Sequence, residues 1–95
     1  MRKIQFYIDS ETSLPHIYKH KVTEEEVEHV LSRPGEDRLG REGTRVAIGQ
    51  TQAGRCLRVI YVPEAESGNI FIITAHDLRG KALLAYRRRR RRRKR

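Results

Sequence analysis

The sequence predicts an α+β fold in which helices pack on one face of a small antiparallel sheet, in the order strand, helix, three strands, helix. Short runs with alternating apolar residues predict the strands, and two segments with apolar residues at helical spacing predict the helices. A chain of 95 residues has room for one domain with one modest core. We assign that domain to residues 1–86 and treat 87–95 as a basic tail.

The first strand is predicted from Ile4, Phe6 and Ile8, which occupy every second position. A polar turn follows it, and residues 14–21 then form a short connector that contains two histidines.

The first helix has the clearest local signal. Thr23 as the N-cap and Glu26 three residues later form a capping box, and valines before the cap and at the fourth helical position form a hydrophobic staple. Pro34 and Gly35 disfavour continuation of the helix. The pattern therefore predicts a helix over 24–32.

A three-stranded meander is predicted in the second half of the chain. After a polar loop at 35–43, strands are expected at 45–51 and 55–62, joined by a tight hairpin turn, and at 69–75. Both faces of 55–62 are apolar except at Arg58, so this strand is expected to be central and covered on both sides. Arg58 would need an acidic partner, a phosphate or a path to water.

The last helix is predicted over 78–86, where apolar residues lie at helical spacing: Leu78, Ala82, Leu83 and Tyr86. Asp77 is a suitable N-cap for it. The pattern allows the helix to continue into the arginines that follow.

The net charge of +9 comes entirely from the tail. Residues 87–95 are all Arg or Lys, which leaves 12 basic residues to balance 12 Asp and Glu in the remainder. Such a run gains affinity for polyanions by releasing their counterions. The basic run therefore predicts non-specific contact with nucleic acid. The alternatives are a solvated tail, and a tail that docks on an acidic partner protein in an assembly role.

Composition excludes several other classes. Cys56 is the only cysteine, which rules out an internal disulfide and a multi-cysteine zinc site. No apolar run approaches the ~20 residues of a membrane span, and we find no signal peptide, so we expect a cytoplasmic protein without membrane contact. His16 and His20 have metal-pair spacing but lack a third ligand. We interpret them as surface histidines and expect no metal and no cofactor.

Arginines on the predicted hairpin suggest a binding surface. Arg45, Arg55 and Arg58 fall on its two neighbouring strands, and arginine binds phosphate through paired hydrogen bonds at any working pH. One sheet face that offers several of them suits an RNA backbone. The alternative is internal salt bridges, from Arg45 to Glu42 and from Arg58 to a glutamate of the first helix.

Several short motifs in a defined order resemble the BrnT-type toxins, which are small RelE-like ribonucleases of toxin–antitoxin pairs. They are Lys-His-Lys-Val-Thr-Glu-Glu-Glu-Val at 19–27, Arg-Glu-Gly-Thr-Arg at 41–45, Arg-Cys-Leu-Arg-Val-Ile-Tyr at 55–61, Ile-Ile-Thr-Ala-His at 72–76, and Tyr86. The resemblance covers residues 14–86.

The resemblance implies metal-independent cleavage of mRNA by attack of the 2′-hydroxyl on the adjacent phosphate, and a cognate antitoxin as partner. The catalytic candidates are His20, Arg58, His76 and Tyr86. The predicted nucleic-acid-binding residues are Lys19, Arg45, Arg55, Arg79, Lys81, Arg87, Arg88, Arg89 and Arg90. A non-catalytic nucleic-acid-binding domain with an arginine-rich tail is the alternative function.

Overall fold

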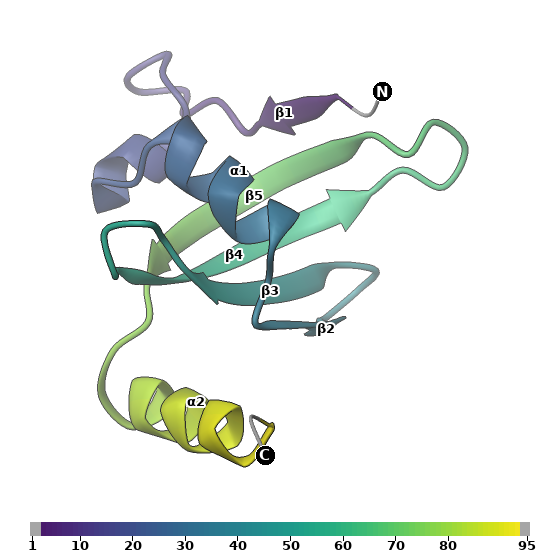
Figure 1. Cartoon of the computed structure of the whole chain (residues 1–95). Helices are drawn as coiled ribbons and strands as arrows, with labels where there is room; N and C mark the ends of the chain where they lie inside the picture. Colours follow the sequence, from purple (N-terminus) through teal and green to yellow (C-terminus); the bar gives the residue numbers. More distant parts are fainter. Residues whose placement is uncertain (1–2, 94–95) are drawn as a thin grey trace.

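The computed structural model describes residues 3–93 and has an α+β architecture built on a five-stranded sheet, with strand order β1-β5-β4-β3-β2 (Figure 1). The elements along the chain are β1 (Ile4–Phe6), the 3-10 helix η1 (His16–His20), α1 (Glu24–Ser32), β2 (Glu36–Leu39), β3 (Arg45–Gln50), β4 (Cys56–Pro63), β5 (Ile70–Asp77) and α2 (Gly80–Arg93). The predicted helix 24–32 and the predicted meander are confirmed, with strand ends shifted by one or two residues.

The sheet is mixed, so the prediction of a purely antiparallel sheet is wrong. β1 pairs in parallel with β5, with Ile4 opposite Ile70 and Phe6 opposite Ile72, while all other neighbours are antiparallel. Alternation of apolar residues identifies a strand but carries no information about its partner. Here the partner lies near the other end of the chain.

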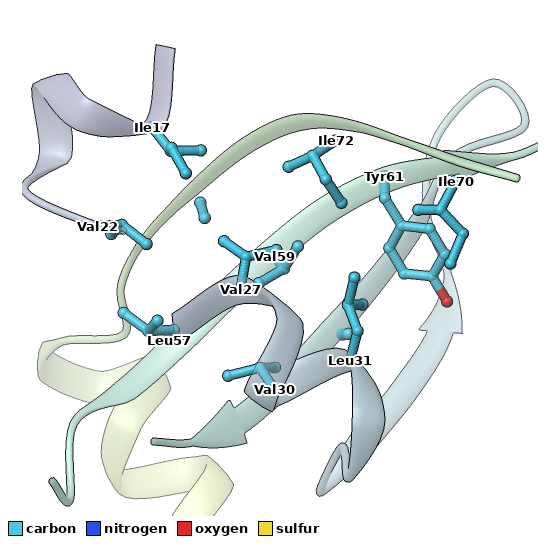
Figure 2. Packing of buried hydrophobic residues seen from close by; sticks show 12 residues of the cluster. Ile17, Val22, Val27, Val30, Leu31, Leu57, Val59, Tyr61, Ile70 and Ile72 are labelled. Atoms are coloured by element: carbon cyan, nitrogen blue, oxygen red, sulfur yellow. The ribbon is translucent and has the colours of Figure 1, made fainter. Parts of the chain in front are cut away.

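The two helices lie on opposite faces of the sheet, which corrects the prediction that both pack on one face (Figure 1). On one face Val27 and Val30 of α1 pack in a cluster with Leu57 and Val59 of β4 (Figure 2). On the other face, side chains of α2 join a second cluster with β3 and β4, centred on Ile48. The apolar character of both faces of 55–62 required this double covering.

The N-terminus of α1 forms as its capping box predicts. The Glu26 backbone N–H donates to Thr23 Oγ1 at 3.1 Å, and the Thr23 N–H donates to Glu26 Oε1 at 3.0 Å. Val27 and Val30 are fully buried, so the helix is held against β3 and β4 along its apolar stripe.

A strand occupies the segment predicted as a loop at 35–43. β2 pairs antiparallel with β3, from Glu36 opposite Ile48 to Leu39 opposite Arg45. Its residues are mostly polar because it is an edge strand with little buried surface. Hydrophobic alternation therefore cannot reveal it.

The last helix begins at Gly80 and continues through the arginine run to Arg93. Asp77 is the last residue of β5, where its carboxylate binds two arginines, so it does not serve as the N-cap predicted for this helix. Arg89 holds the helix to β2 through both oxygens of Glu36, and Arg90 donates to the Gly35 carbonyl at 3.2 Å. Within residues 3–93, no helix combines the length and the apolar character needed to cross a membrane.

Candidate active site

A cleft of about 330 Å³ opens where β5 ends beside η1. We call it the histidine cleft, and its lining residues are Lys19, His20, Lys21, His76, Asp77 and Arg79. Two predicted catalytic residues and two predicted binding residues therefore meet in one place. They come from segments that lie far apart in the sequence.

Aromatic rings form a chain of tilted and edge contacts that leads into the cleft. The ring centroids of His20 and His76 are 5.8 Å apart, those of His16 and His20 are 5.5 Å apart, and Tyr7 lies 6.0 Å from His16. His20 and His76, two of the predicted catalytic residues, are thus in ring contact, and His16 extends the series away from the cleft.

Asp9 anchors η1, the segment that carries His20. Its carboxylate is 2.8 Å from Lys19 Nζ and 3.2 Å from His16 Nδ1, and it accepts the Glu11 backbone N–H at 2.9 Å. The hydrogen bond from Lys19 is the main reason that the pKa of this carboxyl falls well below its usual range. Ile17, which is 1% exposed, fixes the other side of η1 in the core.

Arg55 joins four parts of the chain behind the cleft. It donates to Asp77 at 2.5 Å, to Glu26 at 3.1 Å, and to the backbone carbonyls of Lys21 at 2.7 Å and His20 at 3.2 Å. All three guanidinium nitrogens are thereby engaged. These contacts favour a positioning role for Arg55, because it holds the backbone of His20, over the predicted contact with nucleic acid.

The protonation of His20 is shifted by its surroundings. Loss of hydration beside the neighbouring rings lowers its pKa, and repulsion from His16, His76 and Lys19 lowers it further. A neutral imidazole is therefore favoured at pH 7. His76 Nδ1 lies 3.2 Å from the Asp77 carbonyl oxygen, and since a carbonyl only accepts, this contact places the proton on Nδ1.

The carboxylate of Asp77 forms the acidic side of the cleft. Its hydrogen bonds from Arg55 and then Arg79 lower its pKa, so it stays ionised. Arg79 is 82% exposed and bonds Asp77 through a single Nη2 contact of 2.9 Å, which leaves other donors open to solvent.

Arg45 and Arg58 lie on opposite faces of the sheet, so the predicted shared arginine face does not form. Arg45 stands opposite Tyr61, on the side of α1, whereas Arg58 stands opposite Ile48 and His76, on the side of α2. The predicted salt bridges also differ. Arg45 binds Asp37 at 3.0 Å, not Glu42.

Arg58 cannot reach a glutamate of α1, because that helix covers the other face. Its Nε is buried and has no hydrogen-bond partner among the described residues. Its side chain lines a small cavity beneath α2 with Ala82 and Arg89, and it does not line the histidine cleft. Only its backbone position, opposite His76, connects it to the predicted catalytic pair.

The remaining predicted site residues lie along α2. Tyr86 is buried against Gly35 and does not join the histidines. Lys81 is exposed outside the cleft lining, Arg87 and Arg88 are exposed, and Arg89 and Arg90 bind the body of the protein.

Three contributors were not predicted from the sequence: Lys21, Asp77 as a member of the cleft, and Asp9 as its support. The position of Asp77 close to the predicted end of a strand was the available signal, since functional residues often lie where an element of the scaffold meets a loop. Within residues 3–93, no group of three or more His, Cys, Asp or Glu is arranged to hold a metal ion.

Comparisons of the chain with family models, with curated proteins and with solved structures find no match.

Proposed function

We propose that the chain is a metal-independent ribonuclease of the RelE-like toxin type and that the histidine cleft is its active site. The observation that carries the proposal is the His20–His76 pair, 5.8 Å apart between ring centroids, in a cleft that also contains Lys19, Lys21 and Arg79. Two imidazoles in one cationic cleft can supply a base and an acid to a phosphodiester that the cations hold.

The reaction uses the two histidines in different protonation states. Neutral His20 accepts the proton of a ribose 2′-hydroxyl, and the 2′-oxygen forms a bond to the adjacent phosphorus. The bond from phosphorus to the 5′-oxygen breaks, and protonated His76 gives a proton to that oxygen. The products are a 2′,3′-cyclic phosphate and a 5′-hydroxyl.

The cations of the cleft stabilise the charge on the phosphate oxygens in the transition state. Lys21 is exposed and Arg79 keeps free donors, so both are suited to this task. A cognate antitoxin, which the resemblance implies, belongs to the same proposal, since a protein that covers the cleft would keep the enzyme inactive.

The test is cleavage of an RNA oligonucleotide in the presence of EDTA. We expect cleavage to a cyclic phosphate, and a loss of roughly 10²–10⁴-fold in rate for His20→Ala and for His76→Ala, the range for removal of one acid–base group. Arg41→Gln removes an exposed cation outside the cleft and is the matched control, expected to keep the rate.

Two results would contradict the proposal that the chain is a ribonuclease. One is equal cleavage by the double variant of His20 and His76, purified in parallel, which would identify a contaminating nuclease. The other is tight RNA binding by the unmodified chain without cleavage. The second result would favour a non-catalytic RNA-binding domain, which the exposed Arg87, Arg88, Arg91 and Arg92 on α2 also support.

A further inference from the structure

A second cavity, of about 500 Å³, lies between the C-terminal end of α1 and the second half of α2. Four arginines line it from two segments of the chain: Arg33 directly after α1, and Arg87, Arg90 and Arg91 on α2. We call it the arginine pocket. It has no lining residue in common with the histidine cleft.

The positive charge of the arginine pocket is not compensated by acids. None of the described residues that line it is Asp or Glu. Within residues 3–93, Arg33, Arg87 and Arg91 have no ion-pair partner, and Arg90 donates only to the Gly35 carbonyl. Guanidinium groups gathered in this way repel one another, so an anion placed among them would be stabilised by all four.

A tyrosine whose hydroxyl has no partner among the described residues adds a second, independent observation. Tyr86 is 5% exposed and lines the pocket, with its hydroxyl at the wall against Gly35. Among the described residues nothing accepts or donates a hydrogen bond to this hydroxyl. Burial raises its pKa, so it remains a neutral donor. An acceptor bound in the pocket would supply a partner for this hydroxyl.

We propose that the arginine pocket binds the terminal phosphate of a nucleotide, with the guanidinium groups and the Tyr86 hydroxyl as donors. A phosphate monoester carries up to two negative charges and three open oxygens, which matches several arginines better than a backbone diester does. The cavity falls within the ~300–1,000 Å³ range of small-molecule sites, so the attached nucleoside has room beside the phosphate. Guanidinium planes can stack on its base.

The phosphate could belong to a free nucleotide or to the 5′ end of an RNA, and one binding experiment distinguishes them. We would compare 5′-phosphorylated and 5′-hydroxyl forms of one 2′-O-methyl oligonucleotide, which cannot be cleaved, by fluorescence anisotropy at 150 mM salt. We expect the 5′-phosphorylated form to bind about tenfold more tightly, which is the affinity that one charge-assisted hydrogen bond contributes. Competition by AMP would identify a free nucleotide as a sufficient ligand; preference without such competition would identify the RNA end.

Equal affinity for the two oligonucleotides, with no binding of AMP, would overturn the proposal. The matched variants are Arg87→Gln and Arg88→Gln, which remove one charge each from adjacent exposed positions, only the first of which lines the pocket. We expect Arg87→Gln and Tyr86→Phe to reduce the preference for the 5′-phosphate. Arg88→Gln should lower the affinity for both oligonucleotides equally. Equal effects of the two arginine variants would contradict the assignment.

His76→Ala separates this inference from the ribonuclease. That variant should lose cleavage and keep the preference for the 5′-phosphate, because the two sites share no residue. Failure of one proposal therefore leaves the other testable.

Discussion

At the residue scale, Gly35 makes the close approach of α2 possible. A Cβ atom at this position would lie 2.0 Å from the Tyr86 hydroxyl oxygen and 3.0 Å from Cζ of the same ring. The Gly35 N–H also donates to the Ile48 carbonyl at 2.8 Å, which starts the pairing of β2 with β3. Gly35, which lies between α1 and β2, thus also provides the space for Tyr86, the aromatic residue that attaches α2.

Gly35→Ala should destabilise the fold by about 1–3 kcal/mol, the usual cost of an overpacked contact. Urea unfolding measures this change. The matched comparison is the same substitution in a Tyr86→Phe background, where the clashing oxygen is absent. We expect a smaller cost there, and an identical cost in both backgrounds would show that the clash is not with the hydroxyl.

His20 is the residue whose ionisation matters most for the proposed reaction. Its pKa is lowered in the folded chain, so the unfolded chain binds this proton more readily. Protonation therefore favours unfolding, and the contribution of His20 to stability is complete above about pH 6.5 and decreases as the pH falls below that value.

The rate of RNA cleavage should follow the same ionisation. If His20 is the base, the acid limb of kcat/KM lies below pH 6.5. His16→Asn removes a neighbouring cationic group and keeps a side-chain donor for Asp9, so the limb should move to higher pH. A pH–rate profile checks both points, and an unchanged limb in this variant would contradict the assignment of His20.

At the element scale, η1 and β5 build the cleft, while Arg55 and Asp9 hold η1 in place from two sides. Lys21 at the C-cap of η1 has a left-handed backbone with φ of 57°, which turns the chain toward α1. The capping box of α1 is the one local sequence signal that predicted part of this region. The remainder depends on contacts between distant segments.

An ion pair with β2 contributes to the attachment of α2, beside the apolar cluster and the hydrogen bond from Arg90. The Glu36 side chain is 11% exposed and accepts from two nitrogens of Arg89, so removal of the guanidinium leaves a carboxylate with fewer donors in a mostly buried place. Arg89→Ala should cost about 1–2 kcal/mol by urea unfolding.

Arg92→Ala is the control for this variant, because Arg92 is an exposed arginine of the same helix without an ion-pair partner among residues 3–93. We expect a change within about 0.5 kcal/mol. Similar losses for the two variants would mean that general charge reduction, and not the contact with Glu36, controls the stability.

At the scale of the whole molecule, the balanced charge of the body conceals an uneven distribution. Its acids hold particular cations: Asp9 holds Lys19, Asp37 holds Arg45, and Asp77 holds Arg55. Among the described residues, Arg87, Arg88, Arg91 and Arg92 on α2 have no ion-pair partner, whereas Arg79 at the rim of the histidine cleft binds Asp77 and keeps further donors open. The two proposals concern these two places.

The sequence predicted those elements whose signals are local. The capping box defined α1, and the double apolar pattern placed β4 at the centre of the sheet. β2 was not predicted, because an edge strand needs no apolar face. The pairing of β1 was not predictable from the sequence, because its partner strand lies far away along the chain. For the site, the structure places His20 and His76 in one cleft, whereas Tyr86 lies on α2 and lines a different cavity.

The parallel pairing of β1 with β5 also determines when the histidine cleft can exist. The contact between Lys3 and Asn69 closes a loop of 66 residues, and η1 packs directly on β5. A ribosome-bound chain whose β5 has not emerged has His20 but neither His76 nor the strand against which η1 rests. The cleft is therefore assembled only after Asp77 at the end of β5 has left the ribosome, so shorter nascent chains that already expose His20 have no cleft.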